Sequence, residues 1–308
     1  MILNPKETTK RAATAMQRKN NKTHSRKENT HKEVAIEPRD PLSQVLGHYE
    51  QIDEDSRLEQ GWGPLELART QELILRALQP TPAVVLDIGG GTGIYSAWLA
   101  TLGYEVRLLD PVPKHIDLAR QRSLRQQNQI VQMTVGDARH LEEDDSSVDA
   151  VLLLGPLYHL TERKDRIVSL KEAFRVLRPD GLVFGAAISR FASLLDSLRY
   201  GFFEDPVFAP ILDRDLIDGQ HRNETGNPQY FTTSFFHRPG ELSRELIEAG
   251  FRIESLSAIE GPGWLARDFD DLWTDRALRQ RLLESIRRVE HEPTILGASA
   301  HILAVGRK

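Results

Sequence analysis

The 308-residue sequence contains no cysteine, which removes several chemistries at once. Disulfide bonds, thiolate zinc sites and covalent catalysis through a thiolate are all excluded. No apolar run approaches the roughly 20 residues of a membrane-spanning helix, and no signal-peptide core is present, so we expect a cytoplasmic chain with no membrane partner. Length alone allows two domains, but we favour one α/β domain with insertions.

The first 33 residues differ in composition from the rest of the chain. They hold nine Lys or Arg against three Glu, with few large apolar residues, a composition that cannot bury a core. We predict a basic, disordered tail over residues 1–35 and a folded domain over residues 36–308. The whole chain has a net charge of −5, so the domain without its tail is strongly acidic. This acidity argues against a broad surface that binds nucleic acid.

What the sequence does have is an apolar strand that runs directly into a glycine-rich turn. Val84–Ile88 is followed by the turn and then by a helical pattern from Ile94, which is the arrangement of a nucleotide-cofactor site. The dinucleotide fingerprint requires a glycine where this chain has Ile94, and a P-loop requires a lysine that the turn lacks. Asp87 would repel a pyrophosphate and favour a ligand with an ammonium and a sulfonium. The glycines of the turn are Gly89, Gly91 and Gly93.

The pattern Asp-x-Gly-x-Gly-x-Gly after an apolar strand resembles motif I of the class I S-adenosylmethionine-dependent methyltransferases. The resemblance covers roughly Asp40 to Lys308, and its motifs lie between Asp87 and Gly181 in the family's order. It implies a Rossmann-like α/β fold, with a seven-stranded, mostly parallel sheet and helices on both faces. It also implies S-adenosyl-L-methionine as the cofactor, bound beyond the carboxyl ends of the strands where the strand order reverses.

Further motif residues follow the next strands. Asp110 ends the strand that begins at Val106 and matches the family's ribose-binding position, although an acid here would also suit NAD. The resemblance assigns Asp137 to the adenine amino group and the backbone amide of Ala138 to the adenine ring. Gly155 follows the fourth strand and is a further cofactor candidate.

A helix from Pro64 to Leu78 is predicted by apolar residues with helical spacing. Glu66 and Arg69 share one face of it, so Arg69 is a candidate either for the carboxylate of the cofactor's methionine part or for a surface pair with Glu66. The sequence does not choose between these roles. Upstream, Tyr49 and Trp62 are candidates for a lid over the cofactor, with core packing the simpler role for Trp62.

Two segments exceed what a minimal domain of this kind needs, at about residues 189–240 and 261–299. Insertions at the carboxyl edge of a sheet usually carry substrate contacts, so we predict helical insertions that form a substrate lid. Methyl transfer needs its reactants in line, and a base helps when the nucleophile carries a proton. The candidate catalytic residues are His159 with its neighbour Tyr158, and His221 and His237 in the first insertion.

The turn from Gly155 to Tyr158 limits the substrate. It lacks the side-chain acceptor of the family's DNA amino-methyltransferases, and Gly155 offers no ligand for the magnesium that catechol-type members bind near this strand end. We therefore predict no metal and a small-molecule acceptor methylated at oxygen or nitrogen. Two alternatives stay open: an RNA or protein methyltransferase that uses the basic tail, and a non-catalytic binding subunit that keeps the fold.

Overall fold

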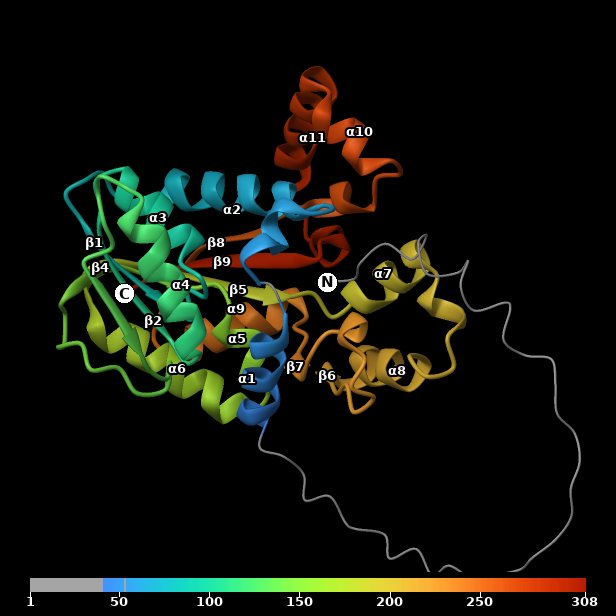
Figure 1. Cartoon of the computed structure of the whole chain (residues 1–308), viewed down its shortest axis with the longest axis horizontal. Coiled ribbons are helices and arrows are strands. Elements are labelled where there is room, and N and C mark those ends of the chain that lie inside the picture. Colours follow the sequence, from blue (N-terminus) through green and yellow to red (C-terminus); the bar gives the residue numbers. More distant parts are fainter. Residues whose placement is uncertain (1–40, 53) are drawn as a thin grey trace, which may run out of the picture.

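The computed structural model of the chain describes residues 41–52 and 54–308, so the tail predicted over residues 1–35 lies outside the described residues. Seven strands form one sheet in the order β3-β2-β1-β4-β5-β9-β8 (Figure 1). Neighbouring strands from β3 to β5 are parallel, whereas β9 is antiparallel to both β5 and β8. The predicted mostly parallel sheet is confirmed. Its strands are β1 (Val84–Ile88), β2 (Glu105–Asp110), β3 (Gln132–Val135), β4 (Val148–Leu153), β5 (Leu177–Ile188), β8 (Arg252–Ala258) and β9 (His301–Arg307).

Buried side chains of the strands alternate between two apolar cores, one on each face of the sheet, as the two-residue repeat of a strand requires. In β1, for example, Val85 packs into one core and Leu86 into the other. Helices α2, α3 and α4 contribute to the first core and α6 and α9 to the second, so helices cover both faces as predicted. Their bounds are α2 (Gly63–Ala77), α3 (Ile94–Thr101), α4 (Pro113–Leu124), α6 (Arg163–Val176) and α9 (Pro239–Glu248).

Strand β5 is irregular at its start. Leu177 pairs with Val148 of β4, and pairing resumes only at Leu182. The residues in between bulge out of the ladder, with Asp180 in the left-handed region at φ 64°. Strand β5 therefore contains a bulge near its start.

Both insertions are largely helical. The first forms a lobe beside the sheet (Figure 1), and its core joins Phe208, Ile211 and Leu212 to Tyr230. Helices α10 and α11 of the second insertion project away from the sheet in the same view. The lobe contains α7 (Ala192–Tyr200), α8 (Ala209–Asp218), β6 (Gln220–His221) and β7 (Ser234–Phe235), and the projection contains α10 (Phe269–Thr274) and α11 (Arg276–Val289).

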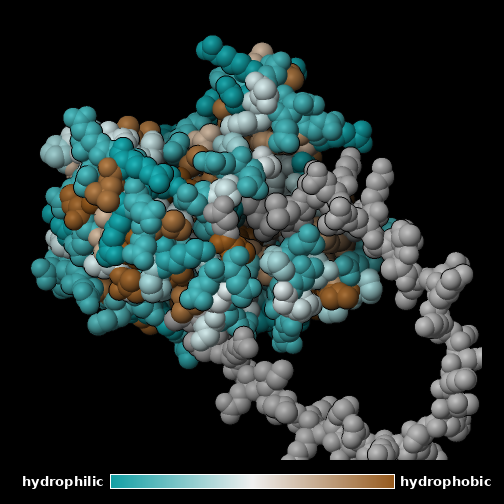
Figure 2. All heavy atoms as spheres, viewed as in Figure 1, coloured by the Kyte–Doolittle hydropathy of each residue, from teal (hydrophilic) through white to brown (hydrophobic). Residues whose placement is uncertain are grey.

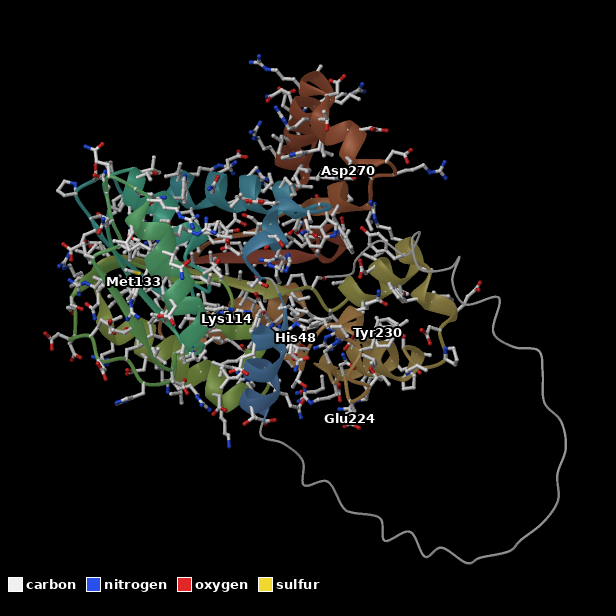
Figure 3. The ribbon with its side chains drawn as sticks, viewed as in Figure 1. His48, Lys114, Met133, Glu224, Tyr230 and Asp270 are labelled. Atoms are coloured by element: carbon white, nitrogen blue, oxygen red, sulfur yellow. The ribbon has the colours of Figure 1, made fainter. Side chains whose placement is uncertain are left out.

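Helix α1 (Pro41–Gln51) lies between the sheet and the lobe. Lys114 at the start of α4 donates a hydrogen bond to the backbone carbonyl of Glu50 at 3.2 Å, and the ring of His48 lies 5.9 Å from that of Phe231. Figure 3 shows His48 between Lys114 and Tyr230. Helix α1 therefore contacts both α4, which packs on the sheet, and the lobe.

A buried ion pair joins α6 to α9 on the second face of the sheet. The guanidinium of Arg166 donates hydrogen bonds to the two carboxylate oxygens of Glu245 at 2.9 and 2.8 Å. It also donates to the backbone carbonyls of Leu160 and Thr161 and lies 3.8 Å above the ring centroid of Phe235. Arg166 thus links four parts of the fold: α6, α9, the segment after β4, and the two-stranded sheet of the lobe.

The surface carries scattered hydrophobic residues among hydrophilic ones on the face shown in Figure 2. Examples of exposed apolar side chains are Leu124 on α4 and Ile217 on α8. Within the described ranges, no helix combines the length and the hydropathy that a bilayer crossing requires.

Candidate active site

A cavity of about 360 Å³ lies at the carboxyl ends of the first four strands. Strand β1 stands between β2 and β4, and the chain winds in opposite directions on its two sides. In open α/β sheets this reversal leaves a crevice beyond the strand ends, where nucleotide ligands bind. Asp87, Asp110, Asp137 and Gly155, which follow or end the four strands, all line the cavity.

The glycine-rich turn forms one wall of the cavity. Gly89, Gly91 and Gly93 have φ angles of 67°, 57° and 77°, the left-handed region that glycine adopts without strain. A Cβ atom on Gly89 would lie 2.7 Å from the ring of Pro156. Gly93 was predicted to bind the cofactor, but it lies outside the cavity lining, which corrects that prediction. Its backbone packs against Ala119 of α4.

Asp87 lies at the base of the turn and is almost completely buried. The hydroxyl of Ser96 donates a hydrogen bond to its carboxylate at 2.6 Å. Burial, together with the nearby charge of Asp110, raises the pKa of Asp87 to about 7 against the lowering effect of the Ser96 hydrogen bond. A cation in this cavity would favour the charged carboxylate.

Asp110 is held by the backbone around it. One carboxylate oxygen accepts from the amide of Gly91 at 2.8 Å, and the other accepts from the amide of Val112 at 2.9 Å and lies 3.1 Å from Nδ1 of His115. Each carboxylate oxygen has two lone pairs, so the oxygen that faces Gly91 keeps one for a hydroxyl donor. These hydrogen bonds therefore fix the carboxylate of Asp110 against the glycine-rich turn.

Asp137 and Ala138 line the opposite part of the cavity. The guanidinium of Arg139 donates to both oxygens of Asp137, the shortest contact being 2.6 Å, and this pairing lowers the pKa of the Asp137 carboxyl. The carboxylate is half-exposed and ionised at neutral pH, which suits a hydrogen-bond acceptor.

Arg69 does not face the cavity, and both of its predicted roles are wrong. The side chain is fully buried and donates to Glu72 at 2.6 Å, to the carbonyl of Ile259 at 3.1 Å and to Glu290. Helix α2 buries this face against the segments at residues 259 and 290, so the guanidinium lies outside the lining of the cofactor cavity and pairs with Glu72 and Glu290 in place of Glu66.

Arg57, which sequence reasoning missed, places a guanidinium in the cavity wall. Arg57 lies in the short 3-10 helix Glu54–Glu59 and donates two hydrogen bonds to Glu66, at 2.8 and 3.0 Å, and one to Glu54 at 2.6 Å. The spacing of Glu54 and Arg57 was the available signal. It could not reveal Glu66 as a partner, because that contact depends on how α2 packs.

The predicted histidines separate in the structure. His159 lines the cavity together with Tyr158, and its Nε2 lies 2.8 Å from the hydroxyl of Tyr49. Burial and the charge of His48 lower the pKa of His159 to about 3, so the ring stays neutral at physiological pH. The predicted lid residue Tyr49 thus contacts the first catalytic candidate directly.

His237 is structural, which corrects its catalytic prediction, whereas His221 lines the second cavity of the site. Nδ1 of His221 lies 2.9 Å from the carboxylate of Asp215 and Nε2 lies 2.6 Å from the carbonyl oxygen of Tyr230, so both nitrogens are occupied. His237 is completely buried against Glu245 at 3.2 Å and lines neither cavity described in this section. Burial also lowers the pKa of His237.

A second cavity of about 110 Å³ adjoins the first. The two share four lining residues, which form the wall between them: Tyr49, Arg57, Tyr158 and His301. The rest of the second lining is largely aromatic and comes from both insertions as well as the segment before α2. These aromatic residues are Trp62, Phe208, Tyr230, Phe231, Phe236 and Trp264. The predicted lid residue Trp62 thus lines this second cavity and also packs on Trp264, with 5.5 Å between ring centroids.

His301 stands in the shared wall beside two carboxylates. Its Nδ1 donates to Glu260 at 2.8 Å and lies 4.0 Å from Glu66. Glu260 is itself buried and accepts from the hydroxyl of Ser299 and from the backbone amide of His301. Sequence reasoning missed this cluster, because no local pattern joins residues 260 and 301. The pairing of β8 with β9 brings them together.

Residues 86–185 match the family described as a methyltransferase domain. This match, the sheet order and the cavity at the glycine-rich turn support a class I S-adenosylmethionine-dependent methyltransferase.

Curated relatives are similar over most of the chain. A ubiquinone biosynthesis O-methyltransferase of Xanthomonas axonopodis pv. citri is 25% identical over 248 residues, which cover 80% of this chain and 92% of the relative. A protein of the same name from Xylella fastidiosa is 27% identical over 64% of this chain and 72% of its own length.

Solved structures show the same fold. A methyltransferase from Methanosarcina mazei superimposes with a TM-score of 0.53 at 21% identity, over 77% of this chain and 96% of that one. One from Mesorhizobium loti gives 0.53 at 19% identity, over 79% of this chain and all of that one.

Proposed function

We propose that this protein transfers a methyl group from S-adenosyl-L-methionine to a hydroxyl oxygen of a small aromatic molecule. The observation that carries the proposal is the pair of adjoining cavities, one acidic at the sheet edge and one lined by aromatic rings. Aromatic walls suit a flat apolar acceptor. The relatives named as O-methyltransferases support oxygen as the methylated atom.

The charges of the first cavity fit the proposed cofactor. Its lining includes seven acidic side chains against the guanidinium groups of Arg57 and Arg139 and the ammonium of Lys164, so a ligand with a sulfonium and an ammonium is favoured. The seven acids are Glu54, Glu66, Asp87, Asp110, Asp137, Glu162 and Asp165.

We assign the cofactor contacts by chemical type. Asp110 accepts from the ribose hydroxyls, and Asp137 with the amide of Ala138 binds the adenine. The turn from Gly89 to Gly91 approaches the methionine part, and Arg57 replaces Arg69 as the partner of its carboxylate. The cofactor supplies an electrophilic methyl group on a cationic sulfur. The chain orients the acceptor against that group and excludes water with its aromatic wall and α1.

His159 and Tyr158 have positioning roles in this proposal. A neutral His159 whose Nε2 contacts the hydroxyl of Tyr49 holds α1 over the cofactor cavity. Burial raises the pKa of the Tyr158 hydroxyl, so it stays protonated and serves as a hydrogen-bond donor in the wall between the cavities.

Calorimetric titration with S-adenosylmethionine and, separately, NADH tests the cofactor. We expect binding of the former alone, followed by transfer of a radiolabelled methyl group to members of a panel of phenols and catechols. Tight cofactor binding without transfer to any acceptor would favour the non-catalytic subunit. Activity on RNA or protein that disappears when residues 1–35 are deleted would favour the tail-dependent enzyme.

Replacing Asp110 with alanine is expected to weaken S-adenosylmethionine binding by about 1 to 3 kcal/mol, because buried, charge-assisted hydrogen bonds are lost. That is roughly a 5- to 150-fold increase in Kd, measured by calorimetry. Asp117→Ala on the exposed face of α4 is the matched control and should bind normally. An unchanged affinity in Asp110→Ala would contradict the ribose assignment.

A further inference from the structure

We propose that His301, oriented by Glu260, is the general base that accepts the proton of the acceptor hydroxyl. The inference deepens the proposed function and rests on it. It also assigns the second cavity to the acceptor ring, because His301 stands where the two cavities meet.

The fold explains why a residue at the start of β9 reaches the active edge of the sheet. Strands β1 to β5 end at this edge, and β9 runs in the opposite direction beside β5. Its first residue, His301, therefore lies level with Ile188 at the end of β5. Glu260 follows the end of β8, whose Ala258 pairs with Ile302. Two neighbouring strand termini thus hold the imidazole and the carboxylate.

The hydrogen bonds leave one nitrogen of His301 available as a base. The carboxylate of Glu260 accepts from Nδ1, so in the neutral ring Nε2 carries the lone pair. Among the described residues, no hydrogen bond engages Nε2. The ring of Tyr158 lies 6.4 Å away and that of Trp62 5.8 Å away, measured between ring centroids. These rings bound the space in which an acceptor hydroxyl would meet Nε2.

The surrounding charges favour an imidazolium at this position. Burial alone would lower the pKa of His301, but the carboxylates of Glu66 and Glu260 raise it, against an opposing contribution from Arg57. Glu54 adds a further carboxylate on the far side of Arg57, and Tyr158 contributes a neutral hydroxyl. Facing carboxylates therefore outnumber the single guanidinium, and a transferred proton is stabilised.

The proton balance of the step is complete without another reactant. The acceptor O–H bond breaks and its proton moves to Nε2 of His301, while the oxygen electron pair forms the new bond to the methyl carbon. The carbon–sulfur bond breaks, and its electron pair stays on sulfur as a neutral thioether. Glu260 balances the imidazolium charge until the proton leaves to solvent.

The other histidines of the site are poorer bases. His159 has a pKa near 3 and contacts Tyr49, and both nitrogens of His221 are occupied. His115 faces the carboxylate of Asp110 through Nδ1. His301 alone among these four combines a supporting carboxylate with a place in the wall of both cavities.

The experiment compares His301→Gln with the parent chain on catechols of graded acidity, from 4-methylcatechol to 4-nitrocatechol. General-base catalysis contributes about 10²- to 10⁴-fold, so kcat should fall by that factor on 4-methylcatechol. The fall should be much smaller on 4-nitrocatechol, which arrives largely ionised. Cofactor affinity by calorimetry should be unchanged. His291→Gln, at an exposed histidine outside both cavities, is the matched control and should retain full activity.

The pH dependence provides a second measurement that requires no variant. In the parent chain, kcat/KM should rise through one ionisation above the usual histidine value of about 6.5, at the same pH for every catechol. Glu260→Gln should move this inflection to lower pH, because the carboxylate that raises the His301 pKa is lost.

Three results would overturn the proposal while leaving methyl transfer intact. They are full activity in His301→Gln, an equal loss on all catechols, and an inflection that follows the pKa of each catechol. If the parent chain methylates no phenol or catechol at all, the acceptor class of the proposed function fails, and the role of His301 fails with it.

Discussion

The Glu245→Ala variant is expected to unfold with a free energy about 3 to 5 kcal/mol lower than the parent chain. The substitution leaves the guanidinium of Arg166 buried without its carboxylate, and both side chains of the pair are nearly inaccessible to water. Urea unfolding followed by circular dichroism at pH 7 measures the loss. The ion pair at this position joins α6 to α9, so we expect a lower midpoint with little change in cooperativity.

Glu248→Ala is the matched control on the same helix. Glu248 pairs with Arg163 at the exposed surface, where ion pairs contribute little, so its removal should leave the midpoint unchanged. Equal stability of the two variants would contradict the importance of the buried pair.

The pair also predicts a pH dependence. Burial alone would raise the pKa of Glu245, but hydrogen bonds from His237 and Arg166 outweigh it and lower the pKa to about 2. An acid with a depressed folded-state pKa stabilises the fold above its unfolded value, about 4.3. The parent chain should therefore lose this stabilisation as the pH falls from about 4.3 towards 2, and Glu245→Ala should lose less over that window.

The Gly89→Ala variant is expected to lose at least about 100-fold in affinity for S-adenosylmethionine, equivalent to about 2.8 kcal/mol. Its Cβ would lie 2.7 Å from the ring of Pro156 while the backbone is held at φ 67°. The turn must then shift, which moves the amide of Gly91 away from Asp110. Calorimetric titration measures the effect.

Gly201→Ala separates backbone strain from the effect on the site. Gly201 at the end of α7 has a φ of 84°, and no atom lies close to the position of its added Cβ. Left-handed alanine costs about 1 to 3 kcal/mol at either position, so both variants should be less stable, but only Gly89→Ala should lose cofactor affinity. Comparable binding by the two variants would show that the close approach to Pro156 is unimportant.

The sheet could be predicted from the sequence because its signals are local. Val84–Ile88 is a short apolar run that ends in glycine, and α2 has a clear helical spacing, so both were located to within one residue. The bulge in β5 was not predicted, because Leu177 joins the ladder only through pairing with Val148 of another strand. Strand pairing is a property of the folded sheet and leaves no local pattern.

The same distinction divides the site. Asp87 and Asp110 lie in the last residues of their strands and Asp137 follows its strand. The carboxyl ends of parallel strands meet at one edge, so the place of these acids in the cavity was predictable. Arg69 was misplaced because the helical repeat gives the face of a residue but not what covers that face. His301 and Glu260 were missed because 41 positions separate them and only the pairing of β8 with β9 joins them.

Strand β9 lies between β5 and β8, although it is synthesised after both. On the ribosome, the edges of β5 and β8 therefore stay unpaired until residues 301–307 emerge, and unpaired edges invite association with other chains. His301 arrives with that strand. The strand that completes the sheet therefore also brings the proposed proton acceptor to the site.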